Sequence, residues 1–196
     1  MRNSKAGWTQ WFPGLVCFFL LGAGMARGAE PTAFDLIKEG NRYLGEQSKD
    51  KVLAIRSEKS IGGLVPSVWY VVYFEPDAKS KRVELKFGGG RQMGVKRSWR
   101  LFGSSASVDK ILDLKQLKFD SDRAIKTATA EPLLAKLTIK ATQLWLEDSA
   151  PSPVWKVRLW AAKLSKPDVT VDVGDIFISA ETGEVVKSEL RINKAA

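Results

Sequence analysis

The sequence is 196 residues long and contains no histidine and one cysteine, Cys17. Histidine is the commonest general base in enzymes and, with cysteine, supplies most ligands of zinc and copper sites. Because Cys17 lies in a segment that we expect to be removed, the mature chain has no thiol for disulfides or thiol catalysis. Paired carboxylates or a serine–lysine pair are the catalytic groups still open to an enzyme. No cofactor and no metal site is predicted.

The apolar run near the N-terminus is short. Residues 15–21 (LVCFFLL) form it, whereas a membrane-spanning helix needs ~20 apolar residues. The positive residues Arg2 and Lys5 precede the run, and residues 26–28 (ARG) offer small residues at positions −3 and −1 of a cleavage site. We therefore predict that residues 1–28 are a signal peptide and that the protein is periplasmic or secreted.

Retention of this segment as an uncleaved membrane anchor is the alternative interpretation. A lipoprotein is excluded, because Val16, which precedes Cys17, is not a small residue. Removing 28 of 196 residues leaves 168, enough for one ordinary domain or two small ones. It also removes three basic residues, so the formal net charge falls from +9 to +6. A basic surface suits anionic polymers or lipid head groups, and it is also an ordinary solvated surface.

Hydrophobic periodicity predicts that a helix followed by four strands occurs twice along the chain. A weak capping box predicts a helix over 33–47. Residues 103–119 look like a connection, after which Asp120 or Ser121 can cap a second helix over 120–130. The strands predicted from alternation and from β-branched and aromatic residues are 51–57, 67–74, 81–87, 94–101, 137–146, 154–162, 174–180 and 184–192.

Two pairs of segments suggest an internal duplication. Residues 67–71 (SVWYV) match 153–157 (PVWKV), and residues 95–101 (VKRSWRL) match 186–192 (VKSELRI). Their order agrees with the repeated order of elements. The predicted fold class is therefore α+β, with two repeats of one helix packed on an antiparallel β-meander. The repeats are assigned to residues 29–105 and 106–196, after the signal peptide.

Alternation along each strand predicts which side chains are buried. The strand 67–74 is apolar on both faces and is expected to be covered on both, whereas the strands 81–87, 94–101 and 154–162 each have one polar face. In the closing hairpin the acids are expected on the rim. The residues predicted to face the core are Val83, Leu85, Phe87, Val95, Trp99, Leu101, Trp155, Val157, Leu159, Ala161, Ile176, Ile178, Val186, Leu190 and Ile192.

Three segments of the second half carry a family resemblance: DSDRAIKTATA (120–130), VWKVRLWA (154–161) and IFISAETGEVV (176–186). Together they resemble the PepSY domain, a small cystatin-like α+β module of bacterial envelope proteins and of metallopeptidase propeptides. The resemblance covers about residues 115–192, and the first half would be a more divergent copy. One departure is Ser179, which stands where the family usually has aspartate. The resemblance implies peptidase inhibition or chaperoning, or binding at the envelope, without common catalytic residues.

Two motifs are candidates for chemical sites. The acids Asp175, Glu181, Glu184 and Glu189 surround one tight turn, but they lack the dense oxygen spacing of a hard-cation loop. They are interpreted as the solvated edge of a β-hairpin and not as a catalytic or metal site. The run GGGRQMG (88–94) precedes a strand instead of a helix, so it is interpreted as a hairpin tip and not as a phosphate loop.

The candidate binding site is a basic sheet face. Cations on neighbouring strands are predicted to point to the same side, with Trp160 adding apolar contact and with Lys79 and Arg91 near the strand ends. A plain solvated face is the alternative interpretation. The candidate binding residues are Arg82, Lys86, Lys96, Arg100, Lys156, Arg158 and Trp160.

The sequence therefore predicts an exported, non-enzymatic bacterial envelope protein. Its partner would be a peptide, a protein or an anionic envelope component, and this binding could extend to the regulation of a peptidase. Nucleic acid is not expected as a partner, because an exported protein rarely meets it. No membrane-spanning segment is expected after signal cleavage. The alternatives are an envelope hydrolase that works without histidine or cysteine, and a structural spacer without a specific ligand.

Overall fold

The computed structural model describes residues 30–97, 110–149 and 151–195. Its helices are α1 (Ala33–Gly40) and α2 (Ser121–Thr129), and four short 3-10 turns lie at η1 (Asn41–Tyr43), η2 (Leu114–Gln116), η3 (Pro132–Leu134) and η4 (Ile192–Ala195). The strands are β1 (Val52–Ser57), β2 (Val68–Phe74), β3 (Arg82–Gly88), β4 (Arg91–Lys96), β5 (Ile139–Glu147), β6 (Val154–Ala162), β7 (Thr170–Ser179) and β8 (Val185–Leu190).

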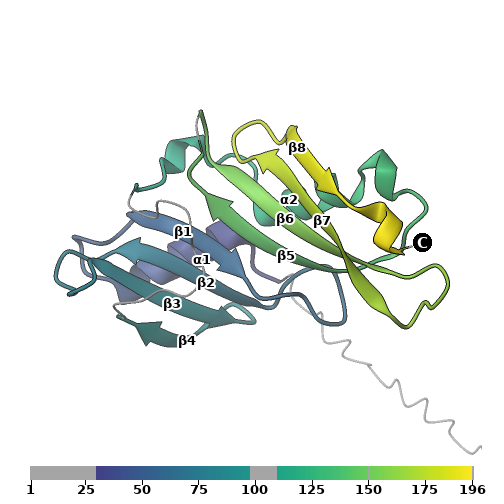
Figure 1. Cartoon of the computed structure of the whole chain (residues 1–196). Helices are drawn as coiled ribbons and strands as arrows, with labels where there is room; N and C mark the ends of the chain where they lie inside the picture. Colours follow the sequence, from purple (N-terminus) through teal and green to yellow (C-terminus); the bar gives the residue numbers. More distant parts are fainter. Residues whose placement is uncertain (1–29, 98–109, 150, 196) are drawn as a thin grey trace, which may run out of the picture.

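All eight strands form one antiparallel sheet in the order β4-β3-β2-β1-β5-β6-β7-β8 (Figure 1). The predicted fold of two repeats, each with its own sheet, is therefore wrong. The two meanders merge because β1 pairs with β5, with Ile55 opposite Leu146 and Arg56 opposite Trp145. This pairing satisfies backbone groups that would otherwise lie at two exposed sheet edges. The predicted boundary at residues 105 and 106 lies outside the described residues.

The helices are shorter than predicted. They contain 8 and 9 residues, and α1 ends at Gly40 instead of continuing to residue 47. A side chain at Gly40 would lie 2.1 Å from the hydroxyl oxygen of Tyr73, so the chain passes very close to this ring. The same hydroxyl donates a hydrogen bond to the Ile37 carbonyl oxygen at 3.0 Å. Tyr73 thus fixes the end of α1 on β2.

Both helices pack on the same face of the sheet: α1 contacts β2, and α2 contacts β5, β6 and β7. One hydrophobic core lies between the helices and the sheet and runs across both meanders. We call the opposite surface of the sheet the open face. Every second residue of the strands points to it, so it holds the polar half of the strand pattern.

Alternation predicted much of the core correctly. The predicted core residues of β3 and β6 are all buried with no exposed area: Val83, Leu85, Phe87, Trp155, Val157, Leu159 and Ala161. Ile176 and Ile178 of β7 are buried as well.

The predicted core assignment is wrong for three residues on or beside the edge strands. Val95 is 44% exposed on β4, and Val186 is 57% exposed on β8, where the register with β7 shifts. Ile192 follows β8 and is 39% exposed. Edge strands have a neighbour on one side only, which leaves their side chains less covered. Trp99 and Leu101 lie outside the described residues.

The strand predicted to be covered on both faces is β2. On the core face Trp69, Val71 and Tyr73 are buried. On the open face Val72 is buried against Leu53 of the neighbouring strand. The second cover therefore comes from neighbours on the same face and not from another layer.

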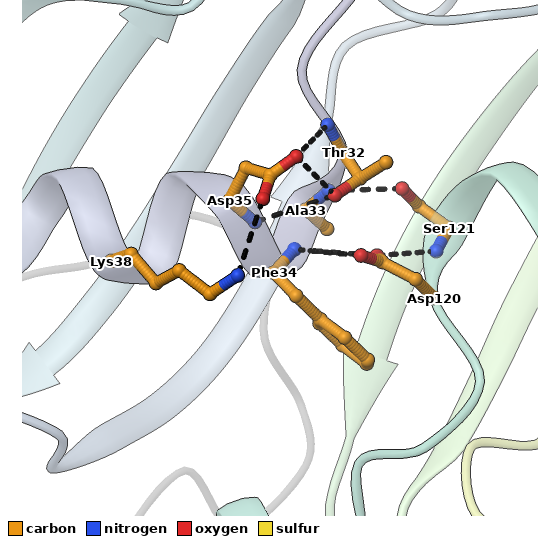
Figure 2. A network of polar contacts seen from close by, with 7 residues as sticks. All are labelled: Thr32, Ala33, Phe34, Asp35, Lys38, Asp120 and Ser121. Atoms are coloured by element: carbon orange, nitrogen blue, oxygen red, sulfur yellow. Dashed lines mark hydrogen bonds and ion pairs between the residues drawn. The ribbon is translucent and has the colours of Figure 1, made fainter.

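The two helices share their N-terminal caps (Figure 2). Thr32 and Asp35 form the predicted capping box of α1. Asp120 caps α2 by accepting from the Ser121 N–H at 2.6 Å, and it also accepts from the Phe34 N–H of α1 at 3.2 Å. The hydroxyl oxygen of Ser121 accepts from the N–H of Ala33 at 3.0 Å. The first turn of each helix is thereby tied to the other.

Candidate binding face

One row of side chains crosses the open face from β3 to β8. Cations and aromatic rings alternate along it, and each residue lies directly opposite the next one on the neighbouring strand. We call it the cation–aromatic row. Its members, in order across the sheet, are Lys86, Tyr70, Arg56, Trp145, Lys156, Phe177 and Lys187.

The first half of the row is built around Tyr70. The Arg56 guanidinium carbon lies 3.9 Å from the centre of the Tyr70 ring, and the Lys86 Nζ lies 5.3 Å from it. Both distances are within the range of cation–π attraction. Cross-strand pairs of this kind stabilise a sheet.

The second half of the row continues the pattern on β5 to β8. The Nζ atom of Lys156 lies 5.7 Å from the ring centres of both Trp145 and Phe177. Lys187 lies on β8, on the side of Phe177 away from Lys156. Its Nζ atom lies 5.5 Å from the Phe177 ring centre. Each ring of the row is therefore flanked by a cation from a neighbouring strand.

Carboxylates pair with the cations of the first half. Glu84 is buried on the open face and accepts from the Arg56 guanidinium at 2.8 Å. Glu58 pairs with Lys86 at 3.4 Å and also accepts a hydrogen bond from the Tyr70 hydroxyl. This hydrogen bond is the main reason that the pKa of Glu58 lies below its ordinary value.

Asp175 pairs with the cations of the second half. It accepts two hydrogen bonds from the Arg158 guanidinium, at 2.8 and 3.1 Å, and lies 3.5 Å from the Lys156 Nζ. Burial raises the pKa of Asp175, but Arg158 and Lys156 more than offset this, so the pKa lies below its ordinary value. The prediction that Asp175 lies on the solvated rim is wrong, because it is only 6% exposed.

The open face is consequently mixed in charge. Lys187, at the end of the row, pairs with Glu189, so each of the row's four cations has a carboxylate partner in the structure. An anionic polymer of uniform charge would meet these carboxylates as well as the cations. The arrangement fits a partner that itself carries both signs of charge.

The structure separates the predicted binding residues into groups. Lys86 and Lys156 belong to the row, and Arg158 lies beside it on β6. Trp160 points to the same face, where the Lys59 Nζ lies 4.5 Å from its ring centre. Arg82 is opposite Phe74, and Lys96 is opposite Glu84. Arg100 lies outside the described residues.

Sequence reasoning missed Arg56, Tyr70, Trp145 and Phe177. Their alignment on one face depends on strand register and on the β1–β5 pairing. In the sequence, Tyr70 and Phe177 are members of apolar runs. The available signal was the repeated occurrence of an aromatic residue among cations on one face.

The acids of the closing hairpin have structural partners. Glu181 pairs with Lys118 at 2.9 Å, and Glu184 accepts from the Thr182 hydroxyl at 3.3 Å. Gly183 has a φ of +80°, as the tight turn requires. In the described part of the chain, no group of three or more histidine, cysteine, aspartate or glutamate residues could hold a metal ion.

Ser179 closes this turn from inside. Its hydroxyl oxygen accepts from the N–H groups of Glu181 and Thr182, at 3.3 and 3.1 Å, and the residue is 5% exposed. A serine or aspartate oxygen can make such bonds to the backbone two or three residues ahead. Ser179 therefore has a turn-forming role.

We expect the Ser179→Ala variant to lose about 1 kcal/mol of unfolding free energy, because two turn N–H groups lose their acceptor. Ser179→Asp keeps an acceptor and should lie closer to the wild type. Ser188→Ala, on the exposed strand β8, is the matched control. Urea unfolding measures the differences, and equal stability of the Ser179→Ala and Ser188→Ala variants would contradict this role.

The lowered pKa of Asp175 predicts that the stability of the protein depends on pH. The pKa of Asp175 is lowered in the folded protein. The contribution of Asp175 to the free energy of unfolding is therefore present above the unfolded-state pKa and is lost as the pH falls through the folded-state pKa. We expect Asp175→Asn to cost about 1–3 kcal/mol at pH 7, since bonds to charged groups are lost. The cost should shrink toward pH 3.

Urea unfolding of the wild type and the Asp175→Asn variant between pH 3 and 7 tests this. Glu189→Gln is the control, because Glu189 lies opposite Asp175 on β8 with a side chain that is 47% exposed. A stability gap between the wild type and Asp175→Asn that does not change with pH would argue against the ion pair.

A scan against protein-family models and searches of curated proteins and of solved structures found no match to this chain. The resemblance to PepSY domains thus stays a prediction. None of the described helices is long and apolar enough to cross a membrane.

Proposed function

We propose that this protein is a non-enzymatic binding protein of the bacterial envelope that holds a protein or peptide against the open face of its sheet. The observation that carries the proposal is the cation–aromatic row. Both helices pack on the other side of the sheet, so the row lies along the surface that they leave uncovered. Tyrosine, tryptophan and arginine are the residues most enriched in the energetic centres of protein interfaces.

The charge pattern of the row favours a protein or peptide over an anionic polymer. The carboxylates Glu84 and Asp175 lie within the same face as the cations that they neutralise. A partner with alternating charges can pair with both the cations and the carboxylates of this face. An anionic polymer would be repelled by the carboxylates. The open face thus favours a partner of matching charge pattern over anionic molecules in general.

A non-enzymatic role is supported by how the acids are used. Asp175 and Glu181 are engaged by Arg158 and Lys118. The resemblance to PepSY domains adds an expectation of peptidase regulation or envelope sensing, and export follows from the predicted signal peptide. The proposal combines these expectations with the geometry of the open face.

Site-specific photo-crosslinking in the producing cell tests the proposal. A photoreactive amino acid replaces Lys187 or Lys86 on the row, and Lys126 on α2 is the control position. Lys126 is exposed on a helix that packs against the opposite face of the sheet. We expect the row positions to yield one adduct of discrete mass that the control position does not.

Charge reversal then checks the role of the row. Lys187→Glu, placed in the protein with the crosslinker at position 86, is expected to weaken partner binding about tenfold, which corresponds to about 1.4 kcal/mol. Lys187 suits this change because its side chain is 61% exposed. The same adduct from position 126, or the absence of any adduct, would refute binding at the open face.

A further inference from the structure

A second surface lies at the end of the molecule near the C-terminus marked in Figure 1. It is a groove of about 500 Å³ between the η3 segment, the loop after β6 and η4. Its lining is mainly apolar and includes Pro132, Leu133, Leu137, Leu164 and Ile192.

The apolar side chains of the groove are well exposed. Leu133 is 55% exposed, Leu164 is 60% exposed and Ile192 is 39% exposed. Single exposed apolar residues are common, but three that line one hollow form a patch. Each comes from a different connection or terminal turn, so no single strand or helix explains their exposure.

Lysines lie in and beside this groove. Lys136 lines it, and Lys163 and Lys194 line an adjoining hollow that shares Asn193 with it. Lys166 follows Leu164 in the same loop. Among the described residues, none of these four lysines forms an ion pair or a cation–π contact, in contrast to the cations of the cation–aromatic row.

We propose that this end of the protein docks on the surface of an anionic lipid bilayer. Exposed leucine and isoleucine side chains would enter the boundary between head groups and acyl chains, and the lysines would contact lipid phosphates. This combination of apolar contact and unpaired positive charge is what peripheral membrane attachment requires. The long lysine side chains can reach head groups while their stems cover apolar surface.

The two surfaces of the protein therefore differ in the partner that they fit. The row neutralises its own cations and suits a partner of mixed charge. The groove end leaves its lysines for an external anion and adds apolar contact beside them. The lipid proposal does not depend on the proposed binding at the open face, because the two use different residues.

Vesicle binding by the full chain tests the proposal. Sedimentation with phosphatidylglycerol vesicles is compared with sedimentation with phosphatidylcholine vesicles, at low and at high salt. We expect binding to the anionic vesicles only, weakened about tenfold by Lys163→Glu combined with Lys136→Glu, because each lysine near such a surface contributes a few-fold. Leu133→Ser combined with Leu164→Ser should weaken it to a similar extent. Lys187→Glu on the row is the control and should leave vesicle binding unchanged.

A local readout separates docking by the groove from attachment by the apolar run at residues 15–21. In a Cys17→Ser background, a polarity-sensitive dye is attached through Ser165→Cys, next to Leu164, or through Lys126→Cys on α2. Anionic vesicles are expected to shift the emission of the first dye to the blue and to leave that of the second unchanged. Vesicle binding without this shift, or no vesicle binding at all, would overturn the proposal. Binding of an acidic amphipathic peptide at the groove without vesicle binding would assign the surface to a protein partner and would overturn it too.

Discussion

Replacing Trp155 with alanine is expected to lower the free energy of unfolding by about 3–5 kcal/mol, the usual cost of removing a buried aromatic ring. Trp155 has no exposed area and is the largest of the fully buried side chains. Its indole N–H donates to the Phe119 carbonyl oxygen at 2.7 Å, and its ring stacks on Phe34 of α1 at 6.2 Å. The substitution would leave a cavity, an unsatisfied carbonyl and a helix without its contact.

Trp160→Ala is the matched control, because Trp160 lies on the same strand but points to the open face. It is partly exposed, so its loss should cost about 1 kcal/mol or less, mainly a lost cation–π contact. Urea unfolding followed by circular dichroism measures both variants. Similar losses for the two tryptophans would show that the core does not depend on Trp155 as described.

Asp120→Ala is expected to cost about 2–4 kcal/mol, because the first turns of two helices lose an acceptor and each cap contributes about 1–2 kcal/mol. Oδ1 of Asp120 serves both N–H groups, those of Ser121 and Phe34. Asp120→Asn keeps one carbonyl oxygen at this position and should not lose stability at pH 7. The contrast between the alanine and asparagine variants isolates the hydrogen bonds from the charge.

The stability difference between Asp120→Asn and the wild type is also expected to depend on pH. Burial is the main reason that the pKa of Asp120 lies above its ordinary value of 3.8. When the pKa of an acid is higher in the folded than in the unfolded protein, the protein loses stability as the pH rises from the unfolded-state pKa through the folded-state pKa. Asp120→Asn should therefore be at least as stable as the wild type at pH 7, and the wild type should gain on it toward pH 3. Urea unfolding at both pH values checks this, and a wild-type advantage that grows with pH would contradict it.

The sequence predicted local features well. Alternation identified the buried residues of β3 and β6, and Asp120 was one of two proposed caps for α2. These features depend on neighbouring residues in the chain, so the pattern within a few residues is enough to find them. The same holds for Gly183, whose positive φ follows from the turn alone.

Features that depend on distant parts of the chain could not be predicted. The pairing of β1 with β5 joins Ile55 to Leu146, and no local pattern reports which strand becomes the neighbour of another. The same limit explains why the sequence predicts a solvated Asp175, since Arg158 reaches it from the adjacent strand. Only the register shows that these side chains meet.

This limit applies to the candidate site as well. Lys86 and Lys156 were found because they are cations on a polar strand face. The aromatic members between them were not, because an aromatic residue in a strand is read first as core. The row emerges when seven residues from seven strands are aligned, and their alignment depends on every intervening strand pair.

The pairing of β1 with β5 has a consequence for assembly of the binding surface. One meander supplies Lys86, Tyr70 and Arg56, and the other supplies Trp145 and the residues beyond it. Closing this pair brings together positions about ninety residues apart in the chain, which is a slow kind of step in folding. A newly synthesised chain in which either meander has formed alone would present only half of the row. A partner that spans the whole row would therefore distinguish finished molecules from incomplete ones, and binding would favour the chain in its final form.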